Sequence, residues 1–118
     1  MLTFLLLCII SHVLGLCSEK TVGEGLCAKV YKNDNCDGEQ LEIASNTKKE
    51  DLGDWRNTIS SLVVKDGCKL RVFQKKYFDG DKKNFQGDVE QLNTVTRGND
   101  NTKTWNDKIS SYKCTCEE

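Results

Sequence analysis

The segment Trp105-Asn106-Asp107-Lys108-Ile109-Ser110-Ser111 has a near copy fifty residues earlier in the chain, Trp55-Arg56-Asn57-Thr58-Ile59-Ser60-Ser61. Both stretches follow the pattern W-x-[ND]-x-I-S-S. Chance explains such a match poorly at this distance. The pattern therefore predicts a two-fold internal repeat, which constrains the fold more than any other feature of the chain.

A second pair of matches supports the same repeat. Tyr31 is followed by Cys36, Gly38 and Glu39, and Phe73 is followed at the same spacings by Phe78, Gly80 and Asp81. The offset between these stretches is 42 residues, so the second repeat carries about eight extra residues before its Trp motif. The polar run from Thr94 to Thr104 is predicted to hold them as an inserted surface loop.

Together these signatures resemble the Greek-key motif of the βγ-crystallin family. That motif has an aromatic-x4-aromatic-x-Gly folded hairpin, followed by a calcium loop of the form [ND]-[ND]-x-x-[ST]-S. The resemblance covers about residues 29 to 113. It implies an all-β, βγ-crystallin-like sandwich of two four-stranded Greek-key motifs, the first over about residues 28–66 and the second over about residues 69–116.

Local patterns also favour an all-β fold. Short segments with alternating or β-branched apolar residues predict strands at 28–32, 40–43, 60–65, 69–74, 83–86 and 109–114. No long segment has a helical period. One helical turn is expected within residues 47–55, capped by Thr47 with Glu50 three residues later.

The first 15 residues are uncharged and almost entirely apolar, which is typical of a secretory signal peptide, although the usual basic start is missing. The alternative is a buried N-terminal strand or helix. The run is too short to span a bilayer, so no integral membrane association is expected. A cut after Gly15 leaves one domain, residues 16–118, with six cysteines, whereas a cut after Cys17 leaves an odd thiol. The protein is therefore predicted to be secreted and extracellular.

Six cysteines in a small secreted domain predict up to three disulfides, and the sequence does not choose among their pairings. Cys17 could join Cys114 or Cys116 and so tie the two ends of the domain together. Cys36 replaces the aromatic residue of the first hairpin, so a disulfide could anchor that hairpin. A zinc site at Cys114-x-Cys116 is a weaker alternative, because its spacing is wrong for a finger.

Charge and composition exclude several functions. The net charge is −1, and Lys and Arg are scattered among Asp and Glu without a basic stripe, so neither nucleic acid nor an anionic membrane is an expected partner. The single histidine, His12, lies in the predicted signal peptide. The mature chain then has no histidine base and no histidine metal ligand, and we expect that the protein is not an enzyme.

The resemblance implies calcium sites, because Asp, Asn and Ser oxygens with backbone carbonyls suit a hard cation. In the family, the two loops exchange ligands. One composite site would use the carbonyls of Lys32 and Thr58, the Ser60 hydroxyl and the Asp107 side chain. The other would use the carbonyls of Gln74 and Lys108, the Ser110 hydroxyl and the Asn57 side chain. Ser61 and Ser111 would instead support the folded hairpins.

Two residues depart from the family pattern. Arg56 stands where the first [ND] belongs and could disturb the first loop. Asn57 leaves one composite site neutral, so the Asp107 site is expected to bind calcium more tightly. With at most one carboxylate per site, dissociation constants of roughly 10⁻⁵ to 10⁻³ M are expected.

The sequence thus predicts a secreted calcium-binding protein with a structural or binding role. The alternative is a disulfide-stabilised inhibitor or toxin that acts on an unidentified extracellular protein partner. The 94–104 loop is its only candidate recognition element, and Arg97 its only plausible anchor. A role like that of the cytoplasmic lens crystallins is disfavoured by the signal peptide and the cysteines.

Overall fold

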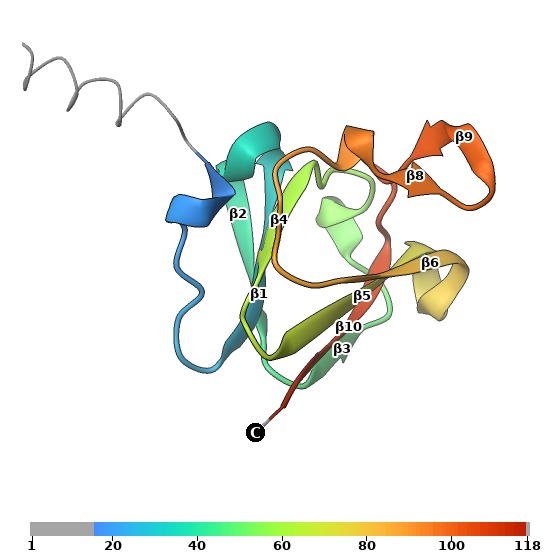
Figure 1. The fold of residues 1–118 in the computed structure, drawn as a ribbon. Coiled ribbons are helices and arrows are strands. Elements are labelled where there is room, and N and C mark those ends of the chain that lie inside the picture. Colours follow the sequence, from blue (N-terminus) through green and yellow to red (C-terminus); the bar gives the residue numbers. More distant parts are fainter. Residues whose placement is uncertain (1–15, 118) are drawn as a thin grey trace, which may run out of the picture.

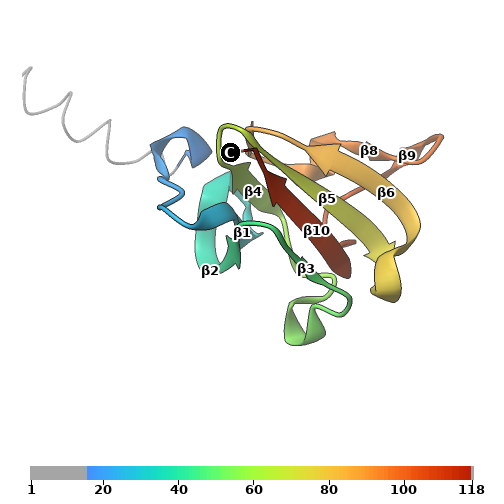
Figure 2. The same ribbon diagram turned by 90° about the horizontal axis from the view of Figure 1, so that it is seen from below.

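The computed structural model describes residues 16–117, and the predicted signal peptide lies outside them. Two four-stranded antiparallel sheets pack face to face (Figures 1 and 2). The first has the order β2-β1-β4-β7 and the second the order β3-β10-β5-β6. The strands are β1 (Leu26–Asn33), β2 (Asp37–Ala44), β3 (Thr47–Lys49), β4 (Ser61–Val64), β5 (Cys68–Lys75), β6 (Asp79–Phe85), β7 (Asp88–Val89) and β10 (Ser111–Cys116). The predicted βγ-crystallin-like sandwich is confirmed.

The two motifs exchange strands. β3 comes from the first half of the chain but pairs with β10, with Lys48 opposite Lys113. β7 comes from the second half but pairs with β4, with Val89 opposite Leu62. Because each sheet contains a strand from the other half, neither half completes its own sheet without its partner.

The predicted helical turn within residues 47–55 is present, but its predicted cap at Thr47 was wrong. Thr47 begins strand β3, and its hydroxyl donates a hydrogen bond to the Ala44 carbonyl (2.7 Å) rather than capping a helix. The only helical turn of this region is a short 3₁₀ helix, η3 (Gly53–Trp55). Pairing with β10 satisfies the backbone of residues 47–49 and overrides their local preference.

Strand alternation places one side of each sheet in a shared core. In β5, Leu70 and Val72 are buried between the sheets, while Lys69 and Arg71 point outward. Trp105 and Ile109 of the second Trp motif are also almost fully buried, so they contribute to the fold. Trp55 is partly buried against the same core.

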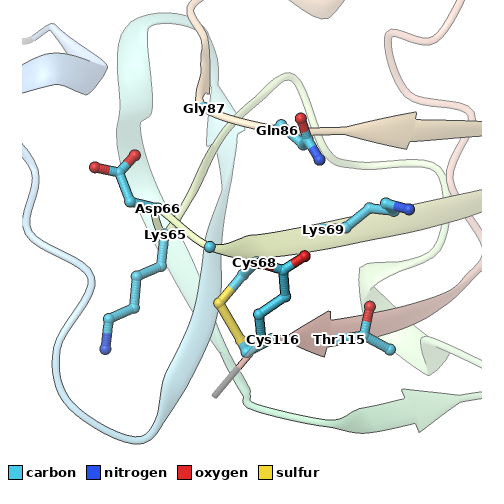
Figure 3. A pocket seen from close by; sticks show the side chains of 10 residues that line it. Lys65, Asp66, Cys68, Lys69, Gln86, Gly87, Thr115 and Cys116 are labelled. Atoms are coloured by element: carbon cyan, nitrogen blue, oxygen red, sulfur yellow. A yellow bond between two sulfur atoms is a disulfide. The ribbon is translucent and has the colours of Figure 1, made fainter.

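Three disulfides link the cysteines of residues 16–117: Cys17–Cys36, Cys27–Cys114 and Cys68–Cys116. The predicted number is confirmed, and so is the anchoring of the first hairpin through Cys36. The suggested link from Cys17 to the C-terminal cysteines was wrong, because Cys27 makes that long-range connection instead. Cys68 and Cys116 lie directly opposite each other on β5 and β10 (Figure 3).

The insertion predicted at residues 94–104 is a small hairpin, β8 (Thr96–Arg97) and β9 (Asp100–Thr104), which lies at one end of the sandwich (Figure 1). Its Arg97 is only 7% exposed. The guanidinium donates to Asp81 Oδ2 (2.9 Å) and to the Thr104 carbonyl (3.2 Å). Arg97 therefore fastens the hairpin to the sandwich and is not displayed to a partner.

Candidate metal centre

The folded hairpins have the same backbone geometry in both halves. Asn35 and Tyr77 adopt left-handed conformations with φ of 61° and 60°. Gly38 follows with φ of +79°, and a Cβ there would lie 2.6 Å from the Asn33 side chain. Only glycine fits this close approach, which explains the glycine of the sequence signature.

The second serine of each Trp motif holds its hairpin in place. Ser61 Oγ accepts a hydrogen bond from the Cys36 N–H (2.8 Å) and donates to the Asn33 carbonyl. Ser111 Oγ does the same with the Phe78 N–H (3.1 Å) and the Lys75 carbonyl (2.6 Å). Both serines are fully buried, so their hydroxyls serve the fold and are not available to an ion.

The two Trp-motif loops lie side by side and are joined crosswise. The Asn57 N–H donates to the Ile109 carbonyl (3.0 Å), and the Asp107 N–H donates to the Ile59 carbonyl (3.0 Å). Asn57 and Asp107 have nearly the same left-handed φ, 60° and 57°. Asn and Asp adopt this conformation more readily than most residues, which accounts for their place in the pattern.

The crosswise joining brings together the side chains of each predicted pair. Ser60 Oγ lies 3.3 Å from Asp107 Oδ1, and Ser110 Oγ lies 3.4 Å from Asn57 Oδ1. Two oxygens that bind one Ca²⁺ at about 2.4 Å each are roughly 3 Å apart. The observed separations therefore fit a shared calcium ion with little rearrangement.

The predicted carbonyl ligands come from residues beside these pairs. The Ser60 N–H donates to the carbonyl of Tyr31 (2.9 Å), the residue before Lys32. The Ser110 N–H likewise donates to the carbonyl of Phe73 (2.9 Å), the residue before Gln74. These two hydrogen bonds bring Lys32 close to the first pair and Gln74 close to the second.

Thr58 and Lys108 occupy matching positions in the two loops, two residues before Ser60 and Ser110, the predicted ligand serines. Within residues 16–117, their carbonyls accept no hydrogen bond. The Thr58 hydroxyl donates to the Trp55 carbonyl (2.7 Å), so that side chain is engaged in the turn. Carbonyl oxygens without a protein donor are the type of ligand that a calcium loop offers.

Arg56 does not disturb the first loop. Its side chain turns back toward Asp51 (Nε to Oδ1, 3.4 Å) and the Gly53 carbonyl (3.4 Å). The Asp51 carboxylate offsets its positive charge. The equivalent Asn106 donates to Asp107 Oδ2 (3.4 Å), so it helps to orient the carboxylate of the second loop.

No other cluster in the described part of the chain competes as a metal site. The sulfur atoms of Cys27, Cys68 and Cys116 lie within 4.8 Å of one another. All three belong to disulfides, whereas zinc requires thiolates. The alternative of a zinc site at Cys114-x-Cys116 therefore does not apply to the oxidised protein.

A polar hollow of about 320 Å³ lies beside the Cys68–Cys116 disulfide (Figure 3). Lys65, Asp66 and Lys69 are among the charged residues that line it. The disulfide beside this hollow joins β5 to β10, so the hollow lies at the end of the second sheet.

Comparison with known proteins identifies the family. The syncollin family model matches residues 16–116. Rat syncollin (Rattus norvegicus) is 33% identical over 106 residues, which cover 83% of this chain and 78% of the relative. Human syncollin (Homo sapiens) is 31% identical over 102 residues, which cover 80% and 75%.

The fold has neighbours among solved structures. A βγ-crystallin domain from Flavobacterium johnsoniae superposes with a TM-score of 0.62 over 77% of this chain and 96% of that domain, at 24% sequence identity. This likeness shows the fold alone. With the matched family model and the two syncollin relatives, it shows that the chain belongs to the syncollin family and has the βγ-crystallin fold.

Proposed function

We propose that this protein is a secreted calcium-binding protein with a structural or binding role rather than an enzyme. The observation that carries the proposal is the crosswise pairing of Ser60 with Asp107 and of Ser110 with Asn57. Neither pair is explained by the needs of the fold, since Ser61 and Ser111 already support the hairpins.

The donor set fits calcium better than other biological metals. Each site would combine two carbonyls, one hydroxyl and one carboxylate or amide oxygen, and water would complete the six to eight ligands that Ca²⁺ takes. Magnesium demands stricter octahedral geometry, and zinc prefers nitrogen and sulfur. Bound calcium would supply positive charge that links the two loops.

Such binding would stabilise the folded protein. An ion that binds only the native state adds about 1.4 kcal/mol for each tenfold excess of its concentration over the dissociation constant. Dissociation constants of roughly 10⁻⁵ to 10⁻³ M allow millimolar extracellular calcium to fill the sites. The three disulfides agree with secretion, because they persist in oxidising compartments.

Within residues 16–117, no helix has both the length and the apolar character needed to cross a membrane. The inhibitor or toxin alternative loses support from the structure. Its only anchor, Arg97, is buried and bonded to Asp81.

Calcium titration calorimetry on the oxidised protein tests the proposal. Asp107→Ala is expected to weaken the tighter site sharply, and Ser60→Ala to weaken the same site. Glu24→Ala removes an exposed carboxylate that is far in the sequence from both loops. It is the matched control and should leave calcium binding unchanged. The absence of any heat at millimolar calcium would show that the loops serve only as scaffold.

A further inference from the structure

Positive charge gathers on the outer face of the second sheet. Along β5, Lys69 and Arg71 point away from the core, because Leu70 and Val72 point into it. Register places Lys113 of β10 opposite Arg71, and Lys48 of β3 opposite Lys113. Lys82 of β6 lies opposite Phe73. We call these five outward cations the cationic face: Lys48, Lys69, Arg71, Lys82 and Lys113.

The positions directly opposite Lys69 and Arg71 on the neighbouring strands carry no carboxylate. Thr115 lies opposite Lys69, and Asn84 lies opposite Arg71. Two carboxylates border the face, Glu50 just after β3 and Glu117 just after β10. The whole chain has slightly more acidic than basic residues, 18 against 17, so this segregation does not follow from composition.

Within the described residues, no cation of this face forms an ion pair. The ion pairs of residues 16–117 join Lys32 to Glu39, Arg56 to Asp51 and Arg97 to Asp81, and none includes a residue of this face. Like charges directly opposite each other on adjacent strands destabilise a sheet. The arrangement thus costs the free protein stability, which an anionic partner would recover.

One ammonium group is held in place without an acid. Lys113 Nζ lies 4.5 Å from the Phe78 ring centroid and 5.8 Å from that of Phe73. The aromatic faces attract the cation while leaving its N–H donors free for an anion. Lys113 is therefore positioned before any partner binds, which lowers the entropy cost of binding.

The surface beside these cations can also donate neutral hydrogen bonds. Lys69, Arg71, Asn84, Lys113 and Thr115 line a shallow hollow of about 260 Å³ on this face. Figure 3 shows Lys69 and Thr115 side by side on the two neighbouring strands. The planar guanidinium of Arg71 can bind two oxygens of one oxyanion, while the Asn84 amide and the Thr115 hydroxyl suit hydroxyl groups.

We propose that the cationic face binds a sulfated polysaccharide. Adjacent strands are about 4.8 Å apart, and alternate residues along a strand are about 6.6 Å apart, so the cations form a two-dimensional grid. An extended polymer with regularly placed anions can contact several points of this grid at once, while its hydroxyls meet Asn84 and Thr115. A single small anion can contact only one or two.

Two other polyanions fit less well. A membrane surface is usually bound with several apolar side chains that enter the lipid, but Tyr77 is the only large apolar residue that is highly exposed among residues 16–117. A single-stranded nucleic acid needs exposed aromatic faces for its bases, whereas Phe73 is buried and Lys113 already lies over the ring of the half-buried Phe78. The predicted extracellular location, which rests on the proposed function, favours a polysaccharide.

The test uses the oxidised full-length mature protein and a size-defined heparin oligosaccharide. Lys69→Gln/Arg71→Gln removes two cations of the face, and Lys20→Gln/Lys103→Gln removes two exposed cations elsewhere. Loss of two exposed ion pairs is expected to weaken binding about tenfold, and the control double variant should bind like the wild type. The plot of the logarithm of the binding constant against the logarithm of the salt concentration should become less steep by about two units in Lys69→Gln/Arg71→Gln, and should not change in the control double variant.

Further binding experiments distinguish a sulfated polysaccharide from a membrane surface and from binding that depends on calcium. Binding should persist in a calcium chelator, because no proposed calcium ligand belongs to the face, and it should disappear with a fully desulfated oligosaccharide. Equal loss in both double variants, or no binding by the wild type, would overturn the proposal. So would binding to phosphatidylserine vesicles in the absence of any binding to the oligosaccharide. Thermal unfolding of each variant confirms that it is folded.

Discussion

Asn57 and Asp107 occupy matching positions in the two loops but differ in charge. Each can therefore be replaced by the residue type of the other. Their φ angles are 60° and 57°, and each lies within 3.4 Å of the serine hydroxyl of the other loop. Asp107→Asn and Asn57→Asp therefore change one charge with almost no change in shape. If calcium binds between the loops, these substitutions should move affinity in opposite directions.

The size of the effect follows from Coulomb's law. Both residues are exposed, so a water-like dielectric applies. A carboxylate whose charge lies about 4 Å from a doubly charged ion then contributes about 2 kcal/mol, or about 30-fold in affinity. Asp107→Asn should weaken the tighter site by about this factor, and Asn57→Asp should strengthen the weaker site similarly.

Calorimetric titration with calcium, fitted to two sites, measures both constants. Ser60→Ala assigns them, because it weakens the Asp107 site alone. In that background Asn57→Asp should still raise the affinity of the remaining site. Unchanged constants in both single variants would refute the composite geometry. If Asn57→Asp changed only the affinity of the site that contains Ser60, Asn57 would serve its own loop. That result would refute the proposal that each loop supplies a ligand to the site of the other.

Three further predictions concern stability, each measured by denaturant unfolding. Ser61→Ala should cost about 2 to 3 kcal/mol, because it leaves the buried Cys36 N–H without an acceptor, while Ser60→Ala should cost much less. Removing Cys27–Cys114, whose partners are 87 residues apart, should cost about 4 to 5 kcal/mol, more than removing Cys17–Cys36, whose separation is 19. Burial, with the nearby Glu90 and Asp66 carboxylates, raises the pKa of Asp88 above its ordinary 3.8, so its ionised form is disfavoured by folding. Asp88→Asn should therefore stabilise the protein at pH 7 but not at pH 3, where Asp88 is largely protonated, and equal effects at both values would contradict this explanation.

Much of the fold could be predicted from the sequence, because its key residues have narrow geometric roles. Gly38 has a left-handed φ of +79° close to the Asn33 side chain, a position that favours glycine. Ser61 and Ser111 can bond two backbone groups from one buried site. Because such geometric requirements fix the residue type, the same residues recur in both halves of the sequence. The two folded hairpins and the two Trp-motif loops were therefore located correctly.

Strand β3 and the burial of Arg97 depend on residues that are not their sequence neighbours, so the local sequence does not predict them. The segment Thr47–Lys49 is polar and exposed, and it becomes a strand only because β10 supplies its hydrogen bonds. The buried state of Arg97 likewise depends on Asp81 and on the Thr104 carbonyl across its own hairpin. Neither could be recognised from the residue types around it.

The cationic face shows the same limit for charge. Lys48, Arg71 and Lys113 are far apart in the sequence, and their neighbours along the chain give no basic stripe. Strand register alone brings them into one row. The only local signal for this face was the alternation of Lys69 and Arg71 with buried Leu70 and Val72. It indicates a cationic surface only when the residues of the adjacent strands are known.

The fold and the proposed calcium binding rest on adjacent residues with different roles. Ser61 and Ser111 are fully buried and bond the hairpins, so selection for stability alone would retain them. Ser60 and Ser110 turn toward the opposite loop and meet Asp107 and Asn57, contacts that the hairpins do not require. A relative could therefore lose calcium binding at the first serine and keep the whole sandwich through the second. For this reason likeness of fold does not establish calcium binding in the syncollin family, and the proposal for this chain rests on the side chains at positions 57, 60, 107 and 110.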